Sequence, residues 1–285
     1  MRLCSFQARG RASWGLVGAG GGLVDLGRRL GIASLRDFLD AGPVVRVAEF
    51  AGLPADYGFD EVDHLPVIPN PDKIICVGLN YRDHQAETGR PATEHPVLFA
   101  RFAGSQVGHG QPLIKPRESD DLDYEGELAV IIGRPCRRVP EAEAEALGVV
   151  AGYACYNDAS VRDWQRHTHQ IMPGKIFAGT GAFGPWMVTA DEIPDPGALE
   201  LTTRLNGQVE QHASTELLIT SVPALIAYCS TMLPLLPGDV LVTGTPGGVG
   251  FKRVPPLWLR NGDRCEVEIS GIGVLANPVV AEGMT

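Results

Sequence analysis

The segment Asp123-Tyr124-Glu125-Gly126-Glu127-Leu128-Ala129-Val130-Ile131-Ile132-Gly133 places acidic side chains at alternating positions directly before an apolar, β-branched run. This pattern predicts a strand, and because side chains alternate between the two faces of a strand, Glu125 and Glu127 should emerge on the same side, about 7 Å apart. Two carboxylates that close repel and raise each other's pKa unless a cation lies between them. A hard divalent ion is the usual solution. The alternative is a strand end with solvated acidic side chains.

The composition is typical of a soluble globular protein with an acidic charge balance. The chain has 285 residues and a formal net charge of −10, with no Lys/Arg-rich run, so nucleic acid is not an expected partner. Apolar stretches are interrupted before membrane-spanning length and the N-terminus lacks a secretory pattern, which predicts a cytoplasmic protein without a membrane partner. The six cysteines include no C-x-x-C pair, which favours reduced, non-catalytic thiols over a disulfide framework or a zinc site.

The chain divides into two unequal parts. Residues 1–66 predict a small N-terminal domain, and a proline-rich stretch over 65–72 predicts a linker, because proline removes backbone donors and disfavours helix before it. The larger part, 67–285, is rich in strand-like runs, so the expected class is α+β with a majority of strands. The clearest strands are expected at 73–77, 128–132, 239–243 and 264–269, and the clearest helices at 34–40, 141–147 and 222–232.

Two glycine clusters invite a nucleotide-binding interpretation that their details oppose. In Gly18-Ala19-Gly20-Gly21-Gly22-Leu23 the third glycine of a dinucleotide fingerprint would fall at Leu23, so a hairpin turn is predicted instead. The loop Thr243-Gly244-Thr245-Pro246-Gly247-Gly248-Val249-Gly250 lacks the Gly-Lys-Ser/Thr ending of a phosphate loop. Its backbone N–H groups and the Thr245 hydroxyl could still approach a small anionic ligand.

Six short motifs follow one another between residue 70 and the end of the chain. They are Lys73-Ile-Ile-Cys-Val-Gly-Leu-Asn-Tyr-Arg-Asp-His-Gln-Ala-Glu87, the Asp123–Gly133 segment, Gly152-Tyr-Ala-Cys-Tyr-Asn-Asp158, Pro173-Gly-Lys175, Leu205-Asn-Gly207 and Pro237-Gly-Asp239 through Gly250. Their order resembles the fumarylacetoacetate hydrolase family, in its acylpyruvase and 2-hydroxyhepta-2,4-diene-1,7-dioate isomerase-like branch. The resemblance implies a mixed β-sheet barrel or roll for the C-terminal part, one divalent metal and a homodimer. The metal is usually Mg2+, with Mn2+ or Ca2+ as other possibilities.

Carried over residue by residue, the metal ligands of the family fall on Glu125, Glu127 and Asp158. Three carboxylates with open positions for water and substrate suit Mg2+ or Mn2+. Taken alone, Asp158 could instead cap a helix that begins just after it. His167 and His169 could also bind a metal, but substrate-loop or structural roles are preferred because the carboxylates suffice for a hard cation.

His84 and Glu87 are three residues apart in a short helical segment, so their side chains are neighbours. A carboxylate beside an imidazole orients the ring and raises its basicity. In hydrolytic members of the family such a pair activates water and lies on a lid that orders over substrate. The alternative is an exposed ion pair on a surface helix.

The remaining site residues rest on the resemblance alone. It implies that Lys175 faces the metal and stabilises an enolate, and that Gln165, Thr245 and Arg101 bind substrate. Arg101 departs from the family pattern, since many members have lysine there, and Ala178 replaces an aspartate. Both departures bear on the choice of substrate.

These residues predict a Mg2+-dependent hydrolase that cleaves a carbon–carbon bond in a 1,3-diketo acid, such as an acylpyruvate or fumarylpyruvate, in aromatic or related catabolism. The same enolate-stabilising site could instead serve an isomerase, hydratase or decarboxylase of unsaturated 2-oxo diacids. A third possibility is a non-catalytic protein that binds a metal and a small acid. The retained His84, Glu87 and Lys175 argue against that last reading.

Overall fold

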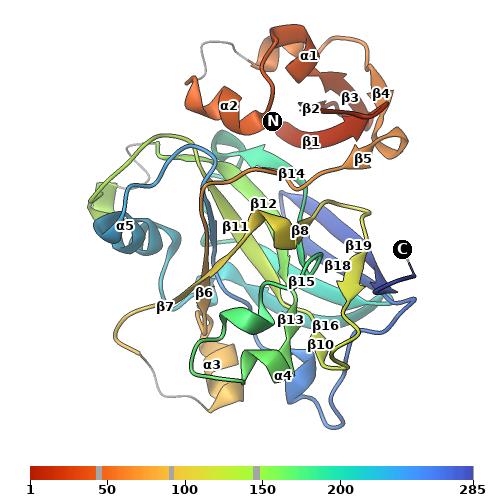
Figure 1. The fold of residues 1–285 in the computed structure, drawn as a ribbon. Coiled ribbons are helices and arrows are strands. Elements are labelled where there is room, and N and C mark those ends of the chain that lie inside the picture. The colour runs from red at the N-terminus through yellow and green to blue at the C-terminus, as the bar shows by residue number, and fades with distance from the viewer. Residues whose placement is uncertain (43–46, 90–92, 144–147, 285) are drawn as a thin grey trace.

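The computed structural model describes residues 1–42, 47–89, 93–143 and 148–284, and strands dominate it (Figure 1). The strands are β1 Arg2–Ala8, β2 Arg11–Val17, β3 Gly22–Asp25, β4 Tyr57–Gly58, β5 Asp63–His64, β6 Ile74–Gly78, β7 Val97–Arg101, β8 Gln106–Val107, β9 Leu113–Lys115, β10 Leu122–Asp123, β11 Gly126–Ile132, β12 Val150–Asp158, β13 Ser160–Val161, β14 Gly181–Thr189, β15 Glu200–Leu205, β16 Gln208–Ser214, β17 Val240–Val242, β18 Arg264–Ile269 and β19 Gly273–Ala281. The helices are α1 Leu26–Leu30, α2 Leu35–Asp40, α3 Arg82–Thr88, α4 Arg162–Gln165 and α5 Val222–Met232.

A large mixed sheet forms the centre of the molecule. Its strands follow the order β4-β3-β2-β1-β14-β12-β11-β17-β6-β7, with β17 and β6 parallel and the other neighbours in this order antiparallel. Every residue of β11 is buried, which explains why its sequence is almost continuously apolar after Glu127. The strand-rich α+β fold expected from the sequence is confirmed. In the part of the chain that the structure describes, the sheet stays open between β4 and β7 and does not close into a barrel.

The second sheet has the order β16-β15-β18-β19-β9 and packs against one face of the first. The alternation of β11 divides two cores between its faces. Leu128 and Val130 belong to the core that includes Val267 and Leu275 of the second sheet, together with part of α5. Ala129 and Ile131, whose side chains lie on the opposite face of β11, belong to the other core, to which residues of the N-terminal part also contribute.

The N-terminal strands extend the central sheet. Strand β1 pairs with β14 in the register Arg2↔Val188, and Leu3 and Trp14 share a core with Ala129. Figure 1 shows these first elements lying against the end of the sheet near β14. The division at residue 66 stays a prediction, and one sheet runs through both parts.

Several local predictions are confirmed. The glycine cluster turns the chain between β2 and β3, where the Gly18 N–H donates to Gly22 O at 2.8 Å. The predicted hairpin turn is therefore confirmed. The helices expected at 34–40 and 222–232 form as α2 and α5, and in the structure Ser34 and Ser221 cap their N-termini. The prediction of an α-helix over 141–147 is wrong for Glu141–Glu143, which form a 3-10 turn. Residues 144–147 lie outside the described residues. No described helix has the length and apolar character needed to cross a membrane.

Candidate active site

The predicted metal ligands meet where β11 begins and β12 ends. Gly126 pairs with Asn157, and the Asp158 N–H donates to Glu125 O at 2.9 Å, so the three carboxylates reach one point. One carboxylate oxygen from each of Glu125, Glu127 and Asp158 lies within 4.8 Å of the others, and all three residues are buried. Glycine is required between the two glutamates, because a Cβ at Gly126 would lie 2.1 Å from the hydroxyl of Thr203 on β15. Since α4 is capped by Val161, the helix-cap reading of Asp158 is wrong.

Three buried cations surround this carboxylate cluster. The Lys175 ammonium donates to Glu125 Oε2 and to Asp158 Oδ2, each at 2.6 Å. Arg162 Nη1 lies 2.7 Å from Glu125 Oε1, and Arg101 Nη1 donates to Asp158 Oδ1. The acids are therefore held in fixed orientations by charge-assisted hydrogen bonds.

The electrostatics of the two glutamates differ although both are buried. Burial alone would raise the pKa of Glu125, but Lys175 and Arg162 outweigh that penalty and hold the pKa at about 2. The pKa of Glu127 is raised well above its usual range, by burial first and then by the charges of Asp158 and Glu125. Burial and the neighbouring carboxylates thus disfavour negative charge at Glu127.

This donor set fits a hard divalent ion. All the ligand atoms are carboxylate oxygens, the set that Mg2+ and Mn2+ prefer, and an added positive charge would relieve the repulsion that acts on Glu127. Glu125, Glu127 and Asp158 are the residues that would hold it.

Backbone N–H groups of the glycine-rich loop after β17 donate hydrogen bonds to acidic side chains around the site. The N–H groups of Gly244, Gly247, Gly248 and Gly250 donate respectively to the carboxylates of Glu127, Asp83, Glu87 and Asp123. Gly244 has a φ of 101°, which glycine adopts without strain. The predicted approach of a small anion to these N–H groups is therefore wrong, because the protein's own carboxylates accept them.

The pair predicted from the His-x-x-Glu spacing forms on α3. His84 Nδ1 lies 3.0 Å from Glu87 Oε2, and His84 is buried. Glu87 also accepts the Gly248 N–H at 3.1 Å. Burial would raise the pKa of Glu87, but the hydrogen bonds from His84 and Gly248 outweigh it and lower that pKa. The pair is therefore built into the site, and the alternative of a solvent-exposed surface pair is wrong for His84.

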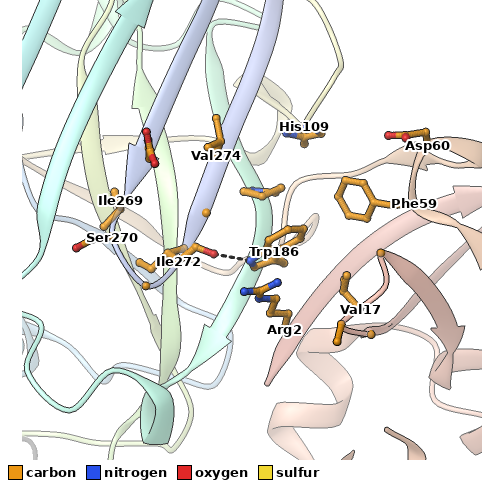
Figure 2. Close-up of a pocket in the computed structure, with 17 residues that line it drawn as sticks. Arg2, Val17, Phe59, Asp60, His109, Trp186, Ile269, Ser270, Ile272 and Val274 are labelled. Atoms are coloured by element: carbon orange, nitrogen blue, oxygen red, sulfur yellow. Dashed lines mark hydrogen bonds between the residues drawn. The ribbon is translucent and has the colours of Figure 1, made fainter. Parts of the chain in front are cut away.

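A cavity of about 350 Å3 joins the carboxylate cluster to the His84–Glu87 pair. Its lining includes His84, Glu125, Glu127, Gln165, Lys175 and Thr245, all predicted site residues. A larger cavity of about 680 Å3 lies elsewhere, between the N-terminal part and the β18–β19 hairpin (Figure 2). There Arg2 stacks on Trp186, whose ring N–H donates to Ile272 O at 2.8 Å. No carboxylate triad has been found beside it among the described residues, so volume alone does not locate the chemistry.

The three predicted substrate-binding residues are placed differently. Gln165 lines the cavity and accepts from Arg162 at 3.1 Å, and Thr245 lines it and donates to Gly126 O at 3.0 Å. Arg101 is 2% exposed and donates to Asp158, to Ala159 O and to Thr180 Oγ1, behind the carboxylate cluster. Because these bonds occupy its guanidinium, its placement favours orientation of Asp158 over contact with substrate.

The two histidines near the site differ as well. His169 lines the cavity and is exposed. His167 packs on Trp164, with the two ring centroids 4.8 Å apart. Neither belongs to the carboxylate cluster, in keeping with the preferred substrate-loop or structural roles. Ala178 is exposed and is absent from the cavity lining.

Arg162 and Asp123 are site residues that the motif reasoning did not assign. Asp123 Oδ2 accepts from Arg162 Nε at 2.9 Å, and its Oδ1 accepts the Gly250 N–H at 2.8 Å, so it links α4 to the loop after β17. The only signal in the sequence was the acidic start of the β11 segment, which contains Asp123 but does not identify its partner.

Comparison with known proteins agrees with this geometry. The family model described as Fumarylacetoacetate (FAA) hydrolase C-terminal matches residues 73–280. The oxaloacetate tautomerase FAHD2A of Bos taurus is 39% identical over 98% of this chain and 92% of its own length. The solved 5-carboxymethyl-2-hydroxymuconate delta-isomerase from Mycobacterium smegmatis is 34% identical, with a TM-score of 0.78 over 99% of this chain and 100% of its own. The maleylpyruvate hydrolase from Sphingobium sp. SYK-6, solved in complex with manganese (II) ion and pyruvate, is 30% identical with a TM-score of 0.81, over 99% of both chains.

The comparisons correct the expected cytoplasmic location. The matching tautomerases of cattle and human are named as mitochondrial proteins, which conflicts with an assignment to the cytoplasm. An acidic composition and interrupted apolar stretches are shared by proteins of several aqueous compartments, so they could not decide the matter. Family membership, in contrast, is decided, because the family model covers most of the chain and relatives match nearly all of it. This chain belongs to the fumarylacetoacetate hydrolase family.

Proposed function

We propose that this protein is a divalent-metal-dependent enzyme that interconverts the enol and keto forms of a 2-oxo acid. The observation that carries the proposal is that one cavity is lined by buried His84, which pairs with Glu87, and by Glu125 and Glu127 of the carboxylate cluster. The similarity to an oxaloacetate tautomerase over 98% of the chain supports the same chemistry.

Glu125, Glu127 and Asp158 are proposed to hold the ion, with Mg2+ as the expected species and Mn2+ as the ion present in a related structure. When bound, the ion would supply Lewis-acid stabilisation of negative charge on the substrate oxygen. Lys175 reaches the same carboxylates with its ammonium and adds positive charge beside them. Preorganised charge of this kind acts where negative charge develops in the transition state.

His84 is the proposed proton carrier. A hydrogen bond from its Nδ1 to Glu87 leaves Nε2 able to accept a proton from substrate carbon and to deliver it to the enolate oxygen, and to carry it back in the reverse direction. The Glu87 carboxylate would stabilise the imidazolium that forms, and its second oxygen is held by the Gly248 N–H. The pair therefore keeps a fixed ring orientation through the reaction.

A second candidate is hydrolytic carbon–carbon cleavage of a 1,3-diketo acid. The same His84–Glu87 pair could take a proton from water, which attacks one carbonyl, and cleavage would release an enolate that is then protonated. The similarity to a maleylpyruvate hydrolase supports this candidate.

One assay separates the two candidates. Enol absorbance is followed for oxaloacetate and for an acylpyruvate with Mg2+ or with EDTA, and NMR identifies the products. Metal-dependent loss of enol signal without bond cleavage supports tautomerisation, whereas a carboxylic acid and pyruvate in equal amounts from the acylpyruvate indicate hydrolysis. No metal-dependent change with either compound would overturn the proposal. The homodimer remains a proposal from family resemblance, and sedimentation velocity tests it.

A further inference from the structure

Phe251, in the loop after β17, is surrounded by basic side chains at the cavity of the candidate site. The Cζ atoms of Arg162 and Arg166 lie 4.4 and 5.4 Å from its ring centroid, and Lys252 Nζ lies 5.6 Å from it. All four residues line the 350 Å3 cavity that also contains Glu125 and Glu127. Cations at these distances are attracted to the face of an aromatic ring.

Only one of the three cations has carboxylate partners in the described chain. Arg162 pairs with Asp123 and Glu125 at 2.8 and 2.7 Å. For Arg166 and Lys252, no carboxylate oxygen lies within 4.0 Å in the described ranges. Arg166 is exposed and Lys252 half-buried, and Glu87 acts on Lys252 only through a longer-range Coulomb interaction, so neither positive charge at the outer part of the cavity is fixed in an ion pair within the described chain.

The positions of these charges along the cavity suggest their use. The inner end is acidic and suits a metal. Arg166 directly follows α4 as its C-cap residue, and Lys252 lies on the loop that follows β17. A small acid whose 2-oxo group is held at the inner end must direct the rest of its chain elsewhere in the same cavity. The Phe251 ring orients the Arg166 guanidinium, whose N–H groups can pair with a carboxylate in a bidentate manner.

We propose that Arg166 and Lys252, here called the rim pair, bind the second carboxylate of a 2-oxo dicarboxylic acid. The enzyme therefore selects diacids over monoacids that share the same acid end but lack the second carboxylate. This inference rests on the proposed function, which places the 2-oxo acid end at Glu125, Glu127 and Asp158. The rim pair would set substrate affinity, because it lies away from the bond that reacts.

Binding of two unreactive acids tests the rim pair independently of turnover. Malate and lactate share a 2-hydroxy acid end, and only malate has a second carboxylate. Calorimetric titration of the Mn2+-loaded protein should give tighter binding of malate than of lactate. In Arg166→Met or Lys252→Met the ratio of the two affinities should fall about tenfold, because each variant removes one charge-assisted hydrogen bond to the second carboxylate. Arg117→Met, which changes an exposed arginine outside the cavity, should leave the ratio unchanged.

Kinetics provides the second readout. With oxaloacetate as substrate, the rim variants should raise KM about tenfold and change kcat little, the pattern expected when uniform binding is lost. Inhibition by oxalate, which reaches only the inner end, should keep its strength.

An unchanged malate-to-lactate ratio in both variants would overturn the rim pair. Equal affinity for the two acids in the unaltered protein would do the same. If the protein prefers malate through the rim pair but no 2-oxo acid turns over, the proposed function fails while the diacid site stands.

Discussion

Replacing Lys175 by methionine tests whether the carboxylate cluster is built for an additional cation. The Lys175 side chain is 2% exposed, and its ammonium lies 2.6 Å from both Glu125 Oε2 and Asp158 Oδ2. Methionine keeps much of the apolar stem and removes the charge. Two buried carboxylates then lose a shared partner, and breaking a buried ion pair from one side costs about 3–5 kcal/mol.

The size of the effect can be stated as a melting temperature. For a chain of this length, 1 kcal/mol corresponds to roughly 2 °C, so Lys175→Met should melt about 6–10 °C lower in EDTA. A divalent ion supplies the missing charge and binds the folded state, so saturating Mg2+ should recover more than half of this loss. Thermal unfolding followed by circular dichroism, with and without Mg2+, measures both quantities.

A half-buried lysine whose carboxylate partner is exposed provides the matched control. Lys115 pairs with Asp120, whose side chain is 79% exposed, and ion pairs with an exposed partner contribute little to stability. Lys115→Met should therefore change the melting temperature by less than about 2 °C, with or without the metal. The reasoning is refuted if Lys175→Met melts like the unaltered protein in EDTA, or if Mg2+ leaves the difference between them unchanged.

Three further outcomes follow from the site and its surroundings. Asp158→Ala should weaken Mg2+ binding by about tenfold or more and abolish turnover, and a calorimetric titration with unaltered affinity would remove Asp158 from the ligand set. His84→Ala and Glu87→Ala should each remove most of the rate and the double variant little more, whereas losses that add in the logarithm of the rate would mean that the two residues act independently. Burial, with the nearby His64 and Arg264 charges, lowers the pKa of His109 from 6.5 to about 4, so the folded state favours the neutral ring. The stability that this gives is complete above pH 6.5 and is lost as the pH falls from 6.5 through 4; His109→Gln should lose less melting temperature over that interval, and equal losses would contradict the assignment.

The parts of the fold that depend on short-range pattern could be predicted. The alternation of Glu125 and Glu127 before an apolar run identifies the start of β11, since the period of a strand is visible within a few residues. The hairpin at Gly18 and the helix over 222–232 could be predicted for the same reason, because both depend on neighbouring residues. The pairing of β1 with β14 joins segments about 180 residues apart, and nothing in either strand specifies that partner.

The candidate site divides in the same way. The His84–Glu87 pair follows from spacing on one helix, and the three carboxylates follow from motifs that end neighbouring strands. Arg101 was expected to touch substrate, but it is buried against Asp158, and its neighbours come from distant segments that the sequence does not bring together. The prediction for the glycine N–H groups of the Thr243–Gly250 loop was also wrong, because the acids that accept them lie more than a hundred residues away.

Anomalous diffraction from a crystal soaked in Mn2+ and oxalate tests the central claim most directly. The account predicts one strong manganese peak bounded by Glu125, Glu127 and Asp158, with carboxylate oxygens at about 2.0–2.3 Å and oxalate completing the coordination. A crystal with bound oxalate and no manganese at these three carboxylates, or with the metal held by other residues, would contradict it.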